Sequence, residues 1–246
     1  MNLAPFPSLP LDVSNFHKFR ETGKIYVDKT ELIYQLASER GQFLFTRPRR
    51  FGKSLLISTF ESLFKNGTKD FFGLFIQGKW KDRTYPVIRL DFSNIKDFSS
   101  RDEFLSLLNE YLFIVMMRSG IEVDGLSPTS GLSVFFEWLS DQLENSVVVL
   151  IDEYDAPLTA YLENAKLLNS AQKILSGFFE ELHRCRQRFR FLFITGIVRF
   201  NPQILFLRSR ISGTFLCCLN TVSCWDLRRK NCSNSFRINF VVQQKS

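Results

Sequence analysis

The sequence has few of the features that mark membrane, secreted or metal-binding proteins. Its 246 residues include only two histidines, and only one of its five cysteines lies before residue 191. The longest clean apolar runs, such as residues 147–151, are strand-length, which excludes a transmembrane helix. Residues 1–7 show neither a basic segment nor an apolar run of signal-peptide length. We therefore expect a cytoplasmic protein with no membrane partner.

Hydrophobic and aromatic residues are plentiful. The chain is 45% hydrophobic and 23% charged, and it contains 27 phenylalanines. A solvated, disordered chain does not carry so many aromatic side chains. The composition indicates a globular protein with a sizeable core, built as one domain or at most two.

The net charge of +7 is distributed unevenly. Residues 1–190 contain 24 basic and 24 acidic residues, whereas residues 191–246 contain 8 basic residues and a single acid, Asp226. The neutral body does not support a nucleic-acid-binding protein. Four cysteines also cluster between residues 217 and 232, so the tail differs from the body in two respects.

Periodicity and capping signals predict alternating strands and helices. The expected helices cover residues 30–40, 53–65, 100–120, 130–144 and 167–188, and the expected strands cover residues 42–46, 86–92, 147–151 and 189–195. Asp28 and Ser100 are expected to cap two of these helices, and Gly41 to end the first. Continuous β-branched runs are typical of strands buried on both faces, which predicts an α/β domain with a mostly parallel sheet. Ligands bind beyond the carboxyl ends of such strands.

The first strand is followed by a candidate phosphate-binding loop. Gly52, Lys53 and Ser54 supply the end of the pattern G-x-x-x-x-G-K-[ST] between a strand and a helix. The glycine lets the backbone approach a phosphate, the lysine reaches the β- and γ-phosphates, and the hydroxyl binds Mg²⁺. The alternative is a basic helix N-terminus in which Gly-Lys-Ser occurs by chance.

The start of this loop departs from the pattern. Arg47 stands where the pattern has its first glycine, and Pro48 has no N–H group to donate. We therefore expect a differently shaped loop, to which Arg49 or Arg50 contributes positive charge.

The third strand ends in two acidic residues. Asp152 is placed to hold the Mg²⁺ shell and Glu153 to polarise an attacking water. Alternatively the segment opens a helix, with Asp155 as its N-cap before Pro157. Both functions are compatible.

The fourth strand ends at Thr195 and Gly196, with Arg199 shortly after. A polar residue at this position can contact the γ-phosphate or the attacking water, and an arginine can offset charge in the transition state. The alternative is a Thr-Gly turn followed by a surface arginine.

These segments resemble the AAA-ATPase-like proteins of the P-loop superfamily, which are often fused to a PD-(D/E)xK nuclease-like domain. The resemblance covers roughly residues 10–200, and a missing first glycine is usual in this family. The segments that carry it are residues 16–20, 26–30, 47–54, 85–88, 151–155 and 193–200. The resemblance also implies that Asp28, Lys29 and Thr30 lie close to the nucleotide, where the pattern alone indicates only a helix cap.

The resemblance implies a P-loop NTPase three-layer sandwich that binds ATP and Mg²⁺, with hydrolysis coupled to a conformational change. The expected nucleotide-binding residues are Arg49, Arg50, Phe51, Gly52, Lys53, Ser54 and Thr195; the metal-binding residues are Ser54 and Asp152; the catalytic residues are Lys53, Glu153 and Arg199. Oligomeric ATPases often use an arginine from a neighbour, so a homo-oligomer is one expectation. The alternative function is a non-hydrolysing nucleotide-binding remnant or an interaction module.

The resemblance ends near residue 200. We therefore expect an ATPase domain over residues 1–200, whose sheet is incomplete at its C-terminal end, and an atypical tail over residues 201–246. A tail translated out of frame accounts for its single acid and clustered cysteines. Alternatives are a zinc site, which the cysteine spacing does not favour, and a basic nucleic-acid-binding tail. No nuclease-like domain is recognisable in the sequence.

Overall fold

The protein is an α/β domain built on a parallel sheet. The computed structural model describes residues 13–121, 123–142 and 147–197. Within them lies a four-stranded sheet of order β1-β4-β3-β2 in which every neighbouring pair is parallel. The strands are β1 (Gln42–Thr46), β2 (Val87–Asp91), β3 (Val147–Asp152) and β4 (Phe189–Gly196). This confirms the α/β class and the parallel sheet predicted from the sequence.

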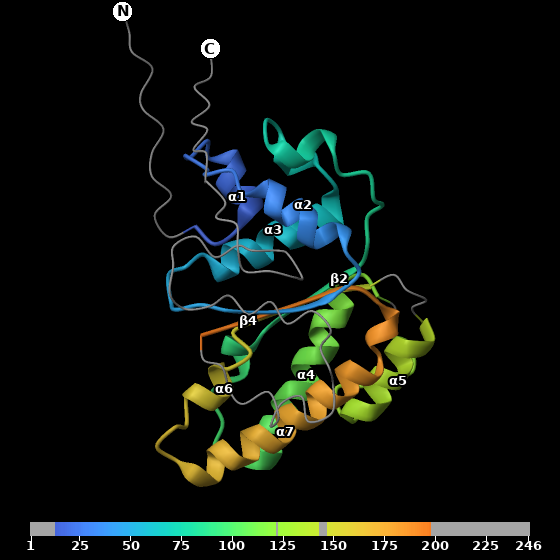
Figure 1. The fold of residues 1–246 in the computed structure, drawn as a ribbon. Helices are drawn as coiled ribbons and strands as arrows, with labels where there is room; N and C mark the ends of the chain where they lie inside the picture. Colours follow the sequence, from blue (N-terminus) through green and yellow to red (C-terminus); the bar gives the residue numbers. More distant parts are fainter. Residues whose placement is uncertain (1–12, 122, 143–146, 198–246) are drawn as a thin grey trace, which may run out of the picture.

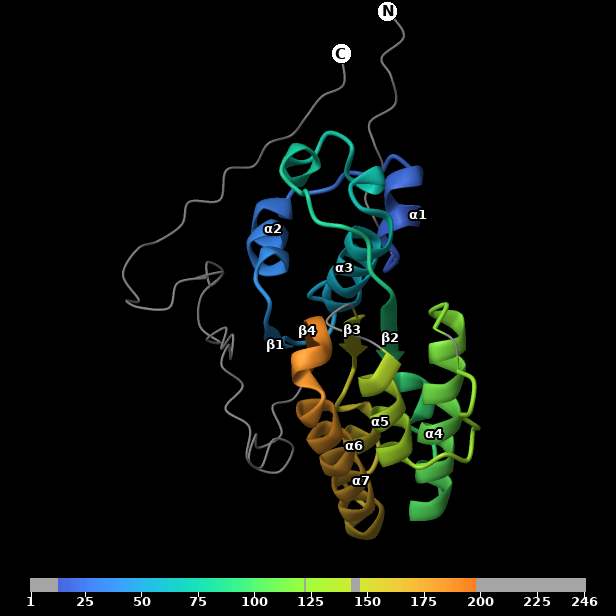
Figure 2. The ribbon, with the colours of Figure 1, turned by 90° about the vertical axis from the view of Figure 1, so that its right-hand side faces the viewer.

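Helices cover both faces of the sheet and form three layers (Figures 1 and 2). One face carries α1 (Phe16–Glu21), α2 (Thr30–Ser38), α3 (Lys53–Asn66) and the short helices η1 (Lys69–Phe71) and η2 (Phe75–Gly78). The opposite face carries η3 (Phe92–Ile95), α4 (Arg101–Arg118), α5 (Leu132–Gln142), α6 (Ala156–Thr159) and α7 (Ala165–Arg184). The short helix η4 (Arg186–Arg188) leads into β4.

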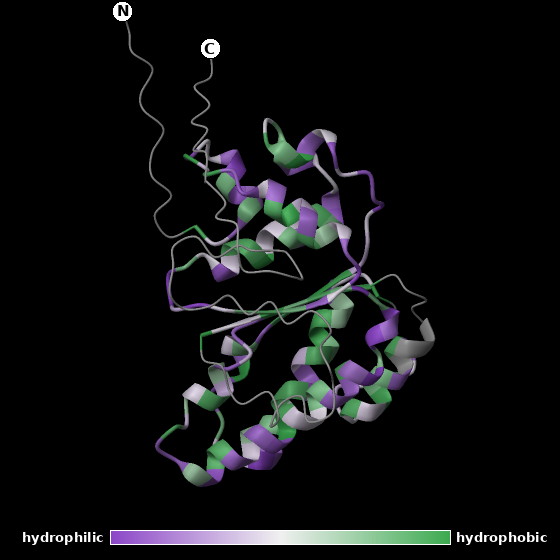
Figure 3. Cartoon of the chain, in the orientation of Figure 1, coloured by the Kyte–Doolittle hydropathy of each residue, from purple (hydrophilic) through white to green (hydrophobic). Residues whose placement is uncertain are grey.

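Each face of the sheet has its own hydrophobic core. Because side chains alternate along a strand, Val147, Val149 and Ile151 of β3 join the core under α4, α5 and α7. Val148 and Leu150 join the core under α2 and α3. Burial on both faces explains why the strands are continuous apolar runs. Figure 3 shows the apolar residues of the strands in green.

The predicted capping box at the start of α4 is confirmed. The Ser100 hydroxyl accepts the N–H of Glu103 at 3.2 Å. The Glu103 carboxylate reaches back to the N–H of Ser99 at 2.8 Å, one residue before the cap. Two donors at the helix start are thereby satisfied.

The predicted start of α2 at Thr30 is confirmed, whereas its predicted caps and its predicted end at residue 40 are wrong. Its N-cap is Lys29. The Asp28 carboxylate accepts the N–H groups of both Thr30 and Phe75 at 2.8 Å, which joins the helix start to η2. The helix ends at Ser38, before an extended residue. Gly41 is not a left-handed cap but a packing position, since an added Cβ would lie 2.7 Å from the ring of Phe43.

The other predicted helices differ from the observed ones mainly at their ends. Helix α4 ends at Arg118 and not at the expected residue 120. Helix α7 ends at Arg184 and not at the expected residue 188, because residues 186–188 form η4. At its start, α7 begins two residues before the expected residue 167, where the Asn164 side chain accepts the N–H of Leu167 at 3.2 Å.

The expectations about the C-terminal part of the fold lie outside the described residues. These are the C-terminal incompleteness of the sheet and the nature of the tail over residues 201–246, including the frame, zinc and nucleic-acid alternatives. In the part of the chain that the structure covers, no helix combines the length and apolar character that crossing a membrane requires.

Candidate functional site

The carboxyl ends of all four strands lie at one edge of the sheet. In the observed register, Thr46 of β1 lies beside Gly196 of β4, and Asp91 of β2 beside Asp152 of β3. The loop before α3 and the acidic end of β3 therefore project from the same edge, on either side of β4. This arrangement brings together the two segments that the sequence predicts to bind a nucleotide.

The loop between β1 and α3 is shaped by two residues with left-handed backbone. Arg50 has φ 67° and Gly52 has φ 74°. Gly52 is also the N-cap of α3 and offers no side chain to the first turn. The N–H groups at the start of this 14-residue helix therefore have no side-chain cap from the described residues. A helix N-terminus of this kind favours an anion such as a phosphate.

Lys53 is the buried cation of the site, with an exposed fraction of 6%. Its Nζ donates to the backbone carbonyls of Arg47 and Pro48, both at 3.0 Å. Burial lowers the pKa of the Lys53 ammonium, while the charges of Asp152 and Glu153 oppose this effect. The two carboxylates thus act on the lysine electrostatically from across the site.

The remaining predicted residues of the loop lie at the surface. Arg49, Arg50 and Phe51 are exposed, Phe51 by 63%, and Ser54 is half-buried on the first turn of α3. The charge of Arg49 contributes to lowering the pKa of Lys53, so its guanidinium acts on the same site. The structure therefore places these residues around the helix N-terminus, whereas their contacts with a nucleotide remain predictions.

Asp152 and Thr195 meet at the ends of β3 and β4. The Thr195 hydroxyl donates to Oδ1 of Asp152 at 2.5 Å, and the same oxygen accepts the N–H of Glu153 at 3.1 Å. Thr195 is fully buried and Asp152 is 1% exposed. These bonds orient the carboxylate and direct the threonine hydroxyl to it.

Glu153 stands in a strained conformation next to this pair. Its φ of 49° is a left-handed value that residues with a Cβ rarely adopt. Burial raises the pKa of its carboxyl group, and the charges of Asp91 and Asp152 raise it further. A carboxylate with a raised pKa is a better proton acceptor than an ordinary glutamate.

Asp91 and Asp155 were not assigned to the site from the sequence. Asp91 ends β2 as Asp152 ends β3, and this position at a strand end could have identified Asp91 as a site residue. Asp155 does occupy the N-cap position of α6, but its side chain makes no cap bond there. Its carboxylate instead accepts the N–H of Ile197, beyond the end of β4, at 2.9 Å. Such a long-range partner cannot be found from local sequence.

Arg199, the predicted catalytic arginine, lies outside the described residues. In the segment that resemblance places near the nucleotide, Lys29 is exposed, while Thr30 is buried and its hydroxyl accepts the N–H of Ile76 at 3.2 Å. The structure thus shows Asp28 and Thr30 joining α2 to η2, and the role of Lys29 stays a prediction.

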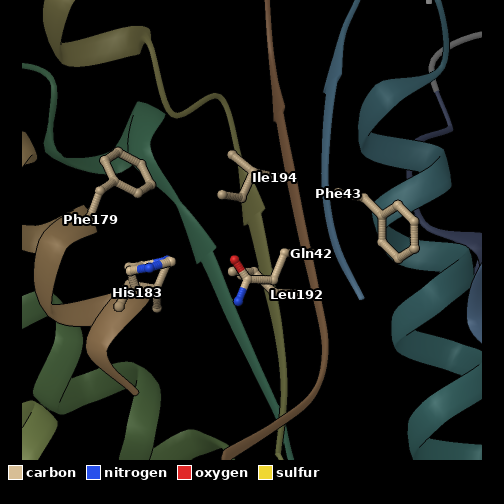
Figure 4. Close-up of a pocket in the computed structure, with 7 residues that line it drawn as sticks. Gln42, Phe43, Phe179, His183, Leu192 and Ile194 are labelled. Atoms are coloured by element: carbon tan, nitrogen blue, oxygen red, sulfur yellow. The ribbon is translucent and has the colours of Figure 1, made fainter. Parts of the chain in front are cut away.

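A small hollow lies at the opposite end of β1, between the sheet and α7 (Figure 4). Gln42, Leu192 and Ile194 line it from the strands, and Phe179 and His183 line it from α7. Its volume is about 10 Å³, which is about the space that one water needs. The hollow is far too small for a nucleotide.

The described residues contain no group of three or more His, Cys, Asp or Glu side chains arranged to hold a metal. Mg²⁺ in phosphate sites usually takes only one or two protein ligands and completes its shell with water and phosphate oxygens. The pair Ser54 and Asp152 is compatible with that mode of binding.

A family model described as "Predicted AAA-ATPase" matches residues 10–206. An "uncharacterized protein in vnfD 5′ region" of Azotobacter chroococcum mcd 1 is 29% identical over 202 residues, which cover 80% of this chain and 39% of the relative. The chain therefore spans about two fifths of that relative's length.

A structure of Drosophila ORC bound to AT-rich DNA and Cdc6 contains a chain with 10% sequence identity and a TM-score of 0.37. The alignment covers 82% of this chain and 28% of that chain.

Proposed function

Because the chain belongs to the predicted AAA-ATPase family, we propose that it binds ATP with Mg²⁺ and hydrolyses it at the carboxyl edge of the sheet. The observation that carries the proposal is the position of Lys53 and the N-terminus of α3 at the same edge as the buried pair Asp152 and Thr195. A phosphate at the helix N-terminus would lie between a cation and a metal-binding carboxylate.

Lys53 and the backbone of residues 51–54 bind the phosphates in this proposal. The ammonium already points back to the loop, where it donates to two carbonyls. A phosphate oxygen is a stronger acceptor for an ammonium than a neutral carbonyl, because it carries a negative charge. The negative charge also favours the protonated lysine that burial disfavours.

In this proposal Ser54 and Asp152 would hold the magnesium ion. Oδ1 of Asp152 accepts two hydrogen bonds within the protein, so we assign Oδ2 to the metal shell. When bound, the ion would supply positive charge opposite the β- and γ-phosphates. Thr195 keeps the carboxylate in the orientation that this shell requires.

Glu153 is the general base that accepts a proton from the attacking water. It follows the metal-binding aspartate directly, and its raised pKa suits a proton acceptor. Arg49 and Arg50 add positive charge at the mouth of the loop, and Arg199 is proposed to offset charge in the transition state.

The test is Mg²⁺-dependent phosphate release from ATP by the wild type and by Glu153→Gln, with Glu163→Gln as the matched surface control. Glu163 is exposed and lies in the segment between α6 and α7. We expect Glu153→Gln to bind ATP normally and to release phosphate at least about 100-fold more slowly. The control should match the wild type.

Turnover by Glu153→Gln at the wild-type rate would show that the base is assigned wrongly. Thermal stabilisation by ATP without phosphate release from the wild type would contradict hydrolysis and favour a nucleotide-binding remnant.

A further inference from the structure

The residues on both sides of Glu153 are fixed to the same residue of β4. Asp152 accepts the hydroxyl of Thr195, and the N–H of Tyr154 donates to the Thr195 carbonyl at 3.0 Å. The left-handed conformation of Glu153 lies between these two attachments. Strained backbone persists only where the surrounding structure holds it, so the contacts between the ends of β3 and β4 determine where the Glu153 side chain points.

Asp155 adds a second connection between these strand ends. Its side chain is 1% exposed and occupies an N-cap position without capping the helix. The carboxylate instead accepts the N–H of Ile197 at 2.9 Å, which fixes the chain directly after β4. A buried carboxylate that serves a distant backbone group has a role other than starting α6.

Gly196 allows the two strand ends to approach this closely. An added Cβ would lie 2.5 Å from the ring of Tyr154 and 2.7 Å from Oδ1 of Asp155. Tyr154 is fully buried and its ring packs edge-on against Phe179, with centroids 6.1 Å apart. The ring therefore has little freedom to move away from β4.

We propose that Asp155 is a positioning residue of the hydrolysis site. Its hydrogen bond to the Ile197 N–H holds the end of β4 against Tyr154 and thereby keeps Glu153 in its left-handed conformation. The inference rests on the proposed function of Glu153, but the lock between Asp155 and Ile197 is measurable without ATP.

The kinetic test compares Asp155→Ala with Asp155→Asn. The alanine variant removes the acceptor, and we expect kcat for ATP hydrolysis to fall about 100-fold, as expected for a misplaced catalytic group, with the Kd for ATP unchanged. The asparagine carbonyl can accept the same N–H, so this variant should keep kcat within about fivefold of the wild type. Wild-type kcat in the alanine variant, or an asparagine variant as slow as alanine, would overturn the proposal.

Hydrogen exchange of the Ile197 amide tests the lock separately from catalysis. We expect a protected amide in the wild type and in Asp155→Asn, and rapid exchange in Asp155→Ala. An unprotected amide in the wild type would overturn the proposal even if no variant folds. Absence of phosphate release by a wild type with a protected Ile197 amide would instead count against the proposed function.

Gly196→Ala should disrupt the same contact between the ends of β3 and β4, from the side of β4. The added methyl group must displace Tyr154 or Asp155, so we expect the same loss of kcat with unchanged Kd. A variant with wild-type kcat would overturn the proposal.

Discussion

Two buried cations of the described residues, Arg190 and Lys53, differ in the partners that meet their charge. Arg190, at the start of β4, is 5% exposed and donates two hydrogen bonds to Oδ2 of Asp82, at 3.0 and 2.8 Å. It also donates to the carbonyls of Ala37 and Glu39. Lys53, at the other end of the sheet, is 6% exposed, and no carboxylate of the described residues forms an ion pair with it.

The difference separates a cation that is paired within the fold from the one that we propose binds phosphate. Arg190 donates four hydrogen bonds, and its guanidinium also lies 5.7 Å from the ring centres of Phe64 and Tyr85. Lys53 has two neutral acceptors and a pKa lowered by burial. A buried charge without a full partner is costly for the fold, so its presence is better explained by binding than by stability.

Of the substitutions that test this comparison, replacement of Lys53 by methionine should have the largest effect, which is on ATP affinity. We expect ATP affinity to fall at least about 1000-fold, equivalent to about 4 kcal/mol, because the phosphates lose their buried cation. The free energy of unfolding should stay the same or rise, since methionine fills the space without a charge to desolvate. Titration with a fluorescent ATP analogue and urea denaturation measure the two quantities.

Lys166→Met is the matched control, because Lys166 is exposed on α7. It should change neither quantity. Unchanged ATP affinity in Lys53→Met would show that the lysine is not the phosphate-binding cation.

Replacement of Arg190 by methionine should have the opposite result. We expect the free energy of unfolding to fall by about 3 kcal/mol, because Asp82 is left without its partner and two carbonyls lose their donors. ATP affinity per folded molecule should not change, since Arg190 lies at the end of the sheet opposite the strand-end site. Urea denaturation that shows a loss below about 1 kcal/mol would contradict the structural role.

Thr195→Val should have a smaller effect, on both the free energy of unfolding and ATP affinity. The change keeps the shape of the side chain but removes the hydroxyl that donates to Asp152. We expect a loss of about 2 kcal/mol in the free energy of unfolding, because a buried carboxylate loses a hydrogen bond. ATP affinity should fall in the presence of Mg²⁺ and not in its absence, if Thr195 acts by orienting the metal-binding carboxylate. A Mg²⁺-independent loss would instead favour direct contact between Thr195 and the phosphates.

The fold and the site were predictable from the sequence to different depths. The continuous apolar runs predict the strands, the Gly-Lys-Ser pattern between a strand and a helix predicts Lys53, and the end of a strand predicts Asp152 and Glu153 as site residues. Helix ends were less predictable: Asp28 serves η2 as well as α2. The partners of Asp155 and Arg190 are 42 and 108 residues away in sequence, and only the parallel strand order brings them together.

The exposed side chain of His17 extends the comparison to the surface. Its Nδ1 lies 2.8 Å from the Asp70 carboxylate and its Nε2 lies 3.2 Å from that of Glu21. The hydrogen bond and charge of Asp70, and then the charge of Glu21, raise the pKa of His17 above its usual value of about 6.5. Burial would raise the pKa of Asp70, but hydrogen bonds from Ser62 and His17 outweigh it and lower that pKa.

These two shifts define the pH range in which the contact stabilises the fold. The histidine contribution is complete below the unfolded pKa of about 6.5 and is lost as the pH rises through the higher folded value. The aspartate contribution is complete above about pH 4 and is lost as the pH falls through the lower folded value. His17→Gln should therefore lower the Tm at pH 5.5 by at most about 2 °C and leave it unchanged at pH 8.5. An equal change at both pH values would show that His17 stabilises the fold by packing and not by its charge.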